Sequence, residues 1–399
     1  MRKKKIIFVH QIVYPYGPNF PAEFSDDFFH FGLGRLIIEN IHEPVPYEFE
    51  NWRADPGIDA PLERYVNGVK CRLFPARRSR KTGAVSVGLL KALKAECREH
   101  EVIIHTANTH SFKLILTALY LKKYPIITTH LGGPNPFYNF KKKRKIQSYF
   151  KYLLEKIALK NVDEFYVSVN AEKDYFTKIA GKEKINFGPV QGAEKTFVES
   201  VPLPRDEARK KLGIPAEKKV ILTVGRLLKS KGADETLEVF KRLTKEYDVT
   251  WIAVGTSPTN VYYQQAKEAG VELLGYISRG DGLMDYFAAA DVYSYPMYHD
   301  PETRAFGGTG IATLEALFYN LPYVGNGIAH IPGGEGANAG IIPNNREELY
   351  RGIKEVFDFP GRFGNTREIV KKYYTWGKVI TRYLQTYREL FAEYYPPAA

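Results

Sequence analysis

Short apolar runs rich in β-branched residues alternate along this chain with longer stretches in which apolar residues recur at helical spacing. In the first half, the short runs cover residues 6–9, 101–104, 125–128, 164–168 and 185–189. In the second half, comparable runs cover residues 220–224, 291–296 and 320–325. Right-handed crossovers collect strands that alternate with helices into parallel sheets. The pattern therefore predicts an α/β fold.

A turn-rich segment at residues 191–204, which includes Pro202 and Pro204, interrupts this alternation near the middle of the chain. A chain of 399 residues is long enough for two domains that each bury a core. We therefore predict a first domain over residues 1–195 and a second domain over residues 196–375. Residues 376–399 continue the pattern of a long amphipathic helix, which begins near residue 374.

A loop with two cations follows the predicted strand at residues 220–224 and precedes a helical pattern. It contains Gly225, Arg226 and Lys231. Open α/β sheets bind ligands at the carboxyl ends of their strands, and a paired arginine and lysine on a glycine-bearing loop suit a diphosphate. Taken alone, such residues are more often solvated surface charges.

A second loop of complementary chemistry favours a binding site over solvated surface charges. Gly307, Gly308, Thr309 and Gly310 precede a helical pattern that contains Glu315. Glycines let backbone N–H groups approach a ligand closely, and the helix behind them adds the positive end of its dipole. A glycine loop alone is usually a tight turn. Two such loops in one half of a chain favour a binding site for a nucleotide diphosphate.

These motifs resemble a retaining glycosyltransferase of family 4. The block from Gly225 to Gly232 is similar to the donor-diphosphate site of that family, and residues 306–317 are similar to its glycine loop and following glutamate. Further matches are found at Gly255, at residues 275–277, at residues 290–296, at residues 340–343 and at Trp376. The resemblance implies the GT-B fold: two facing Rossmann-like domains with parallel sheets, and a C-terminal helix that crosses back to the first domain.

The resemblance also implies an activity and a set of roles. A hexose would pass from a UDP-, GDP- or ADP-sugar to a hydroxyl of a glycan or lipid-linked acceptor, as in glycan biosynthesis, with retained anomeric configuration. Arg226 and Lys231 would hold the diphosphate, and Glu315 would bind the ribose hydroxyls. His130 would contact the donor sugar. The remaining donor-binding positions implied are Gly17, Gly225, Tyr276, Ile277, Gly307, Gly308, Thr309 and Gly310.

The sequence departs from the family at two positions. The family places one glutamate about two helical turns before the other, but this spacing from Glu315 falls on Gly307. Glu302 is the nearest upstream carboxylate and is the candidate for contact with the donor sugar. Gly17 stands where the family often has two adjacent glycines.

No metal motif accompanies these residues. The spacing of His105 and His110 forms no recognisable metal site, and the chain has no Asp-x-Asp signature of metal-dependent sugar transfer. We therefore expect transfer without a metal or another cofactor. His105 and His110 are interpreted as polar supports of strand-end loops.

The charge of the chain lies almost entirely in its first half. Residues 1–200 hold 32 Lys and Arg against 21 Asp and Glu, a net charge of +11, whereas residues 201–399 hold 25 against 24. Residues 51–150 alone carry 19 against 6, with basic clusters at residues 77–81 and 141–145. The resemblance implies that the first domain binds the acceptor and the second the donor, and a basic first domain suits an acidic acceptor at a membrane surface. Such surfaces also serve solubility or adaptation to heat.

The helical pattern after residue 145 also bears on whether the protein contacts a membrane. Ile146, Tyr149, Phe150, Leu153, Leu154 and Ile157 recur at helical spacing. A stripe of this kind next to basic residues can lie on a membrane, although it more often faces a core. Both interpretations remain open at this point.

Other features bound the class of protein. Two cysteines, Cys71 and Cys97, cannot form a disulfide framework, which favours a reducing compartment. The basic start is followed by an apolar run too short for a signal peptide. We expect a cytoplasmic protein, with peripheral contact to the membrane as an alternative. A GT-B protein that binds a sugar nucleotide or glycan without catalysis is the second hypothesis. Nucleic-acid binding ranks last because no recognition motif accompanies the charge.

Overall fold

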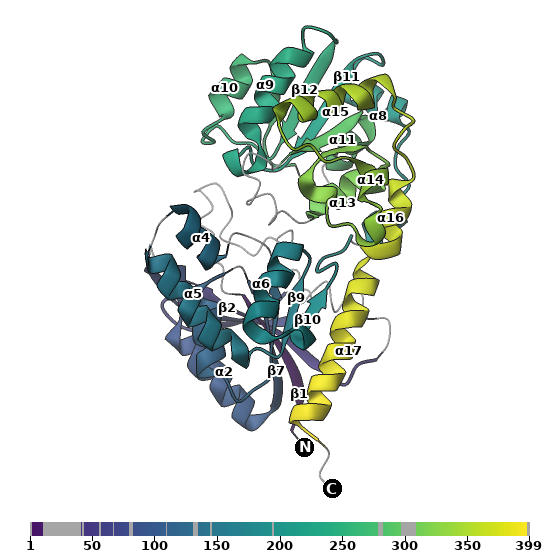
Figure 1. Ribbon diagram of the computed structural model, residues 1–399. Helices are drawn as coiled ribbons and strands as arrows, with labels where there is room; N and C mark the ends of the chain where they lie inside the picture. The colour runs from purple at the N-terminus through teal and green to yellow at the C-terminus, as the bar shows by residue number, and fades with distance from the viewer. Residues whose placement is uncertain are drawn as a thin grey trace. The chain divides into compact units, whose positions relative to one another are not determined.

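The computed structural model describes residues 2–10, 41, 44–55, 57–66, 68–79, 83–108, 110–130, 135–143, 146–193, 195–277, 282–296 and 309–396 (Figure 1). Contacts divide the chain into two compact units. The first unit comprises Met1–Val190 together with Trp376–Ala399, and the second comprises Gln191–Thr375. The boundary in the middle of the chain lies after Val190, whereas the sequence pattern placed it after residue 195.

The first unit is built on an eight-stranded sheet with the order β10-β9-β8-β7-β1-β2-β4-β3. All neighbouring strands are parallel except β3 and β4. The strands are β1 (Lys4–His10), β2 (Glu48–Asp55), β3 (Leu62–Val66), β4 (Val69–Pro75), β7 (Glu101–Asn108), β8 (Ile126–His130), β9 (Glu164–Val167) and β10 (Ile185–Phe187). The short strands β5 (Arg77–Ser79) and β6 (Gly83–Val85) form a separate antiparallel pair.

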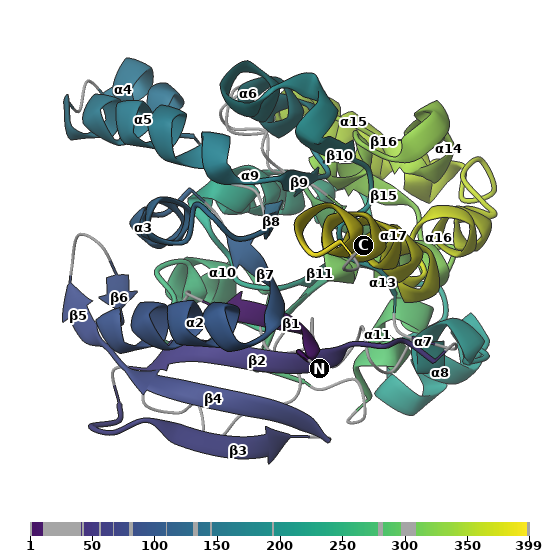
Figure 2. The ribbon, with the colours of Figure 1, turned by 90° about the horizontal axis from the view of Figure 1, so that it is seen from below.

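Helices cover both faces of this sheet, because successive residues of each strand point to opposite faces. Ile7 and Val9 of β1 pack into the core beneath α2 (Val87–Glu99), α3 (Phe112–Tyr120) and α6 (Asn170–Ala180). Ile6 and Phe8 pack into the core beneath α17 (Trp376–Tyr394). Figure 2 shows α2 and α3 on one side of the strands and α17 on the other.

Helix α17 belongs to the first unit although it ends the chain, as the resemblance implied. Its Tyr387 hydroxyl lies 2.7 Å from Nδ1 of His105 on β7. Its Thr386 hydroxyl lies 2.6 Å from the hydroxyl of Tyr166 on β9. Trp376 is 1% exposed at the start of the helix. Buried hydrogen bonds and an aromatic core therefore fix this helix to the sheet.

The second unit is built on a six-stranded, fully parallel sheet with the order β13-β12-β11-β14-β15-β16. The strands are β11 (Lys219–Val224), β12 (Val249–Val254), β13 (Glu272–Leu274), β14 (Val292–Tyr295), β15 (Tyr323–Gly325) and β16 (Gly340–Ile341). Ile221 of β11 packs beneath α9 (Ala233–Leu243) and α15 (Arg346–Asp358). Val220 and Leu222 pack beneath α13 (Ile311–Phe318) and α16 (Thr366–Tyr373) on the opposite face.

The remaining helices connect these elements. In the first unit they are α4 (Pro136–Lys143) and α5 (Ile146–Ala158). In the second unit they are α7 (Lys195–Glu199), α8 (Arg205–Leu212), α10 (Tyr263–Glu268), α11 (Met284–Ala289) and α14 (Gly336–Ala339). Both units therefore have the Rossmann-like arrangement of a parallel sheet between two layers of helices.

Candidate donor site

The strand order of the second unit reverses between β11 and β14. From β11 the chain runs outward to β12 and β13, and it then returns to place β14 on the other side of β11. The carboxyl ends of strands at such a switch point border a crevice in which open α/β sheets bind ligands. Gly225 and Arg226 follow β11 at this point, and Tyr295 ends β14. The loop selected from the sequence therefore lies where the topology favours a ligand.

Gly225 adopts a backbone conformation that other residues rarely take. Its φ angle is 127°. Its amide donates to the carbonyl of Val254 at 2.8 Å, which turns the chain away from β11. A Cβ atom at this position would lie 3.2 Å from the hydroxyl of Tyr295. Gly255, at the end of β12, also has a positive φ of 90°, and a Cβ there would lie 3.4 Å from Cα of Gly225. The two glycines let adjacent strand ends pass closely.

Tyr295 contacts two of the three cations of this loop, Arg226 and Lys231. Its hydroxyl donates to the carbonyl oxygen of Arg226 at 3.0 Å. The ammonium of Lys231 lies 5.1 Å from the centre of the same ring, within the range of a cation–π interaction. Arg226 is exposed, whereas Lys231, at the end of a short 3-10 turn, is partly buried. Burial and the neighbouring positive charge of Arg226 lower the pKa of Lys231. A bound anion would offset both effects.

The second loop reaches the described part of the chain at Thr309. The Thr309 hydroxyl donates to the carbonyl of Gly327 at 2.8 Å, and Gln191 donates to the carbonyl of Thr309 at 2.6 Å. Gly310 is the N-cap of α13, whose first turn directs its N–H groups toward this loop. Glu315 lies on the second turn of the same helix and is 4% exposed. The N-terminus of α13 and the carboxyl ends of β14 and β15 thus lie at the same edge of the sheet.

Tyr276 and Ile277 follow β13 at the same edge of the sheet. Gly255 donates to the carbonyls of Leu274 and Gly275, each at 3.0 Å, which ties the end of β12 to this segment. The Tyr276 side chain is 65% exposed. The backbone of these two residues is therefore fixed beside the Gly225 loop while the aromatic ring of Tyr276 faces solvent.

His130 ends β8 in the first unit and is wholly buried. Its Nδ1 lies 2.9 Å from a carboxylate oxygen of Glu172, and both side chains are at most 1% exposed. Its ring packs edge-on against His110 and Phe176, with centroid distances of 4.6 and 5.0 Å. In this structure the ring of His130 contacts protein side chains rather than solvent. The sequence did not indicate Glu172 as its partner, because the carboxylate lies 42 residues further along the chain.

Four of the expected positions lie outside the described residues: Gly17, Glu302, Gly307 and Gly308. Tyr295 is the residue that sequence reasoning missed in the second unit. The signal for it was its position before Pro296, at the end of a strand that adjoins the glycine loop. Among the residues that the structure describes, no group of three or more His, Cys, Asp or Glu is placed to hold a metal ion.

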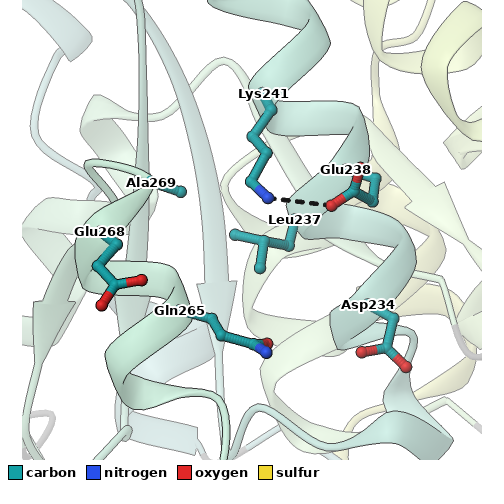
Figure 3. A pocket seen from close by; sticks show the side chains of 7 residues that line it. All are labelled: Asp234, Leu237, Glu238, Lys241, Gln265, Glu268 and Ala269. Atoms are coloured by element: carbon teal, nitrogen blue, oxygen red, sulfur yellow. Dashed lines mark hydrogen bonds and ion pairs between the residues drawn. The ribbon is translucent and has the colours of Figure 1, made fainter.

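A surface hollow between α9 and α10 is a separate feature of the second unit (Figure 3). It has a volume of about 470 Å³ and is lined by the carboxylates of Asp234, Glu238 and Glu268. Lys241 lies in the same hollow and pairs with Glu238 at 3.1 Å. The excess of negative charge disfavours a diphosphate here, so the cationic loop after β11 is the better candidate site.

Solved structures show the class of fold. The chain is similar to sucrose-phosphate synthase from Thermosynechococcus elongatus, with 18% identity and a TM-score of 0.68 over 98% of this chain and 100% of that one. It is also similar to Anabaena Alr3699/HepE, solved in complex with UDP-glucose, with 15% identity and a TM-score of 0.65 over 96% and 99% of the two chains. The two Rossmann-like units and the C-terminal helix α17 have the GT-B fold of these structures.

Sequence comparison points to the same class of protein. Residues 204–373 match the family Glycosyl transferases group 1. A curated relative, the uncharacterized glycosyltransferase MJ1607 of Methanocaldococcus jannaschii, is 24% identical over 192 residues, which are 45% of this chain and 47% of the relative. The chain thus spans about half the length of this relative. The match over residues 204–373 confirms the resemblance seen in the motifs of the second half.

Proposed function

We propose that the protein is a retaining glycosyltransferase that moves a hexose from a nucleotide-diphosphate sugar to an acceptor hydroxyl without a metal ion. The observation that carries this proposal is the pair of cations, Arg226 and Lys231, which Tyr295 organises at the switch point of the second sheet. Alr3699/HepE, which has the same fold, binds UDP-glucose. UDP-, GDP- and ADP-sugars are the candidate donors.

The cations act on the leaving group. As the glycosidic bond breaks, negative charge gathers on the diphosphate while the sugar becomes oxocarbenium-like. Arg226 can pair with two phosphate oxygens through its planar guanidinium, and Lys231 supplies a point charge. Backbone N–H groups around Gly307, Gly308, Thr309 and Gly310, with the N-terminus of α13, would complete the anion site. Glu315 would accept hydrogen bonds from the ribose.

The sugar side of the site rests on His130 and Glu302. The proposed contact of His130 with the donor sugar requires its ring, which is wholly buried against Glu172 in this structure, to become accessible. The carboxylate of Glu302 would take the place of the glutamate absent at residue 307. The leaving phosphate itself would accept the proton of the acceptor hydroxyl, so that no protein side chain is needed as the base. Gly17, Tyr276 and Ile277 would contribute backbone contacts to the donor.

The acceptor is proposed to be a hydroxyl of a glycan or of a lipid-linked molecule. The net charge of +13 over residues 51–150 supports an acidic acceptor or contact with an anionic membrane. Cys71 and Cys97 are both buried and are not joined in a disulfide, which is compatible with the cytoplasm as the proposed compartment. No helix among the described residues is long and apolar enough to cross a membrane.

A panel of UDP-, GDP- and ADP-sugars tests the proposal. We expect one nucleotide to bind and to be released at a rate that an acceptor increases, with the anomeric configuration of the product retained by NMR. Arg226→Gln and Lys231→Met should each weaken nucleotide binding by roughly 10- to 150-fold, the loss of a charged hydrogen bond worth about 1.5–3 kcal/mol. Lys229→Met is the matched control, because Lys229 is exposed on the same turn.

The outcomes separate the two hypotheses. Nucleotide binding with no turnover for any acceptor would favour the non-catalytic sugar-nucleotide or glycan-binding protein. A chain that binds none of the nucleotides, or one in which Lys229→Met weakens binding as much as Lys231→Met, would contradict the site itself. An inverted product would leave the site in place and refute the retaining mechanism.

A further inference from the structure

Helix α5 exposes its apolar residues to solvent. Its five large aliphatic and aromatic positions at a helical spacing of three or four residues are partly or largely accessible: Ile146 (58%), Phe150 (60%), Leu153 (36%), Leu154 (40%) and Ile157 (63%). A surface helix of a globular protein normally turns such a stripe toward the core. The sequence pattern left this choice open, and the structure places the stripe outward.

The opposite face of α5 lies against the interior and carries a buried carboxylate beside the apolar residues Tyr152 and Ala158. The carboxylate of Glu155 is 1% exposed and lies 3.0 Å from Nδ1 of His110. It also accepts a hydrogen bond from Tyr175 at 2.9 Å, and Lys151 donates to the carbonyl of His110 at 2.8 Å. Burial would raise the pKa of Glu155, but His110, Lys151 and Tyr175 lower it overall, so the carboxylate stays ionised.

These bonds fix the rotation of the helix. Turning α5 to bury Phe150 and Ile157 would carry Glu155 away from His110 and Tyr175 and would leave the buried imidazole and phenol without this partner. A buried charge that loses its partner costs far more than an exposed apolar side chain gains by burial of a few contacts. The outward direction of the stripe is therefore built into the core of the first unit.

The neighbouring helix α3 adds to the exposed apolar surface. Helices α3 and α5 pack against each other, and Figure 2 shows them adjacent on the same side of the sheet. Leu116, Leu119 and Tyr120 of α3 are 38–41% exposed. A group of exposed apolar residues on adjoining helices marks a surface that another body covers.

The charge around the exposed stripe of α5 indicates what kind of partner covers it. Residues 136–160 contain eight Lys and Arg and a single acidic residue, Glu155, which is buried in its pair with His110. Lys141, Lys156 and Lys160 are exposed among or beside the apolar residues. A second copy of this chain would bring two positive surfaces together, which is unfavourable. An apolar stripe bordered by lysines matches the headgroup region of an anionic bilayer.

We propose that the outward face of α5, with the exposed lysines Lys141, Lys156 and Lys160, docks the protein on a bilayer that contains anionic lipid. Phe150, Ile157 and their neighbours enter the headgroup region, and the lysines contact lipid phosphates. The inference extends the proposed function, because docking would bring the first unit to a lipid-linked acceptor. The surface itself is independent of the donor site in the second unit.

Vesicle sedimentation of the full chain tests the proposal, with phosphatidylglycerol–phosphatidylcholine vesicles compared with phosphatidylcholine alone. We expect binding to the anionic vesicles only, and weaker binding as salt screens the charges over about 8 Å at physiological ionic strength. The double variant Phe150→Asp/Ile157→Asp should reduce partitioning at least tenfold. Val201→Asp is the matched control, because Val201 is 90% exposed in the second unit, and it should bind vesicles as the unmodified chain does.

A second readout distinguishes insertion from adsorption by charge alone. Brominated anionic lipid should quench the tryptophan fluorescence added by Phe150→Trp. It should not quench the fluorescence added by Val201→Trp. Circular dichroism and nucleotide binding of each variant establish that the chain is folded and that the donor site is intact. If the unmodified chain bound no nucleotide, that result would contradict the proposed function. The vesicle result would still test the docking surface.

Three results would overturn the docking surface. They are no binding of the unmodified chain to anionic vesicles at low salt, equal binding of Phe150→Asp/Ile157→Asp, and equal binding to neutral vesicles. A concentration-dependent dimer that the same double variant abolishes would show that a second copy covers the stripe instead.

Discussion

Replacing Gly225 by alanine tests whether the backbone after β11 shapes the donor site. Alanine has a Cβ atom that makes φ near 127° unfavourable, and that atom would also lie 3.2 Å from the hydroxyl of Tyr295. The chain can respond in two ways. It can keep the turn and accept the strain, or it can move the carbonyl of Arg226 away from Tyr295 and relax.

The expected cost follows from the conformation. A non-glycine residue held in a region that only glycine populates readily costs about 1–3 kcal/mol. The second unit spans Gln191–Thr375. For a domain of that size, each kcal/mol lowers the melting temperature by roughly 2–4 °C, so Gly225→Ala should lower it by about 2–12 °C. If the backbone relaxes instead, stability recovers but Arg226 leaves its position, and the affinity for nucleotide falls by roughly tenfold or more.

Differential scanning calorimetry and titration calorimetry with UDP, GDP and ADP separate these responses. Gly213→Ala is the control for strain alone, because Gly213 has a φ of 68° at the end of α8 and a Cβ there would meet nothing within 4 Å. It should cost about 1 kcal/mol and leave nucleotide affinity unchanged. The double variant Gly225→Ala/Tyr295→Phe removes the hydroxyl contact. We expect it not to restore stability, because the backbone angle dominates.

The reasoning about this loop would fail if Gly225→Ala kept both the melting temperature and the nucleotide affinity of the unmodified chain. It would also fail if Gly213→Ala weakened nucleotide binding to the same extent. A full rescue by Tyr295→Phe would move the cause from the backbone angle to the contact with the hydroxyl.

Three further predictions concern the chemistry of the site. Excess chelator should leave the rate of sugar transfer within about a factor of two, or roughly 0.4 kcal/mol of barrier, and an enzyme that stops and then restarts with magnesium would contradict the role of the cations. Glu302→Ala should mainly lower the chemical rate and Glu315→Ala the nucleotide affinity, so equal losses of affinity by calorimetry would refute this division. Because burial and Arg226 lower the pKa of Lys231, nucleotide affinity should fall with rising pH earlier than for an ordinary lysine. Arg226→Gln should move that fall to higher pH, and an unchanged profile would exclude Lys231 as the titrating group.

The second unit was largely predictable because its strands are buried on both faces. Val220, Ile221 and Leu222 are fully buried in β11, so three consecutive residues at the centre of the strand are apolar. The loops that follow β11 and β14 contain glycines and cations, which can be recognised directly in the sequence. The sequence therefore indicated both the sheet and the loop that carries Arg226 and Lys231.

Strands β2, β3 and β4 of the first unit were not predicted. In β2 the reason is that polar residues occupy buried positions. Glu50 and Asn51 of β2 are 3% and 5% exposed. Glu50 accepts hydrogen bonds from Lys5 on β1 at 3.1 Å and from the indole of Trp52 at 2.8 Å. A periodicity argument counts such residues as exposed. Only the partners, which are 45 residues apart in the case of Lys5, make their burial favourable.

The same limit applies to α5, where the periodicity was right but could not assign the face. The stripe from Ile146 to Ile157 predicts a helix, and the helix is present. Whether that stripe faces the core depends on Glu155, which a pattern of apolar positions treats as a solvated residue. The partners of Glu155, His110 and Tyr175, come from other segments of the first unit. The long-range pairing of one carboxylate thus decides the direction of a whole helix.

Long-range hydrogen bonds of the same kind connect the donor loops. The Tyr323 hydroxyl on β15 donates to the carbonyl of Tyr295 at 2.9 Å and accepts from the amide of Gly327 at 3.2 Å. The Tyr295 hydroxyl then donates to the carbonyl of Arg226. Burial raises the pKa of both phenols well above the physiological range, so they remain donors. Two tyrosines therefore link the ends of β15, β14 and β11. Arg226, at the switch point, is held through its backbone carbonyl, and its guanidinium stays available to a ligand.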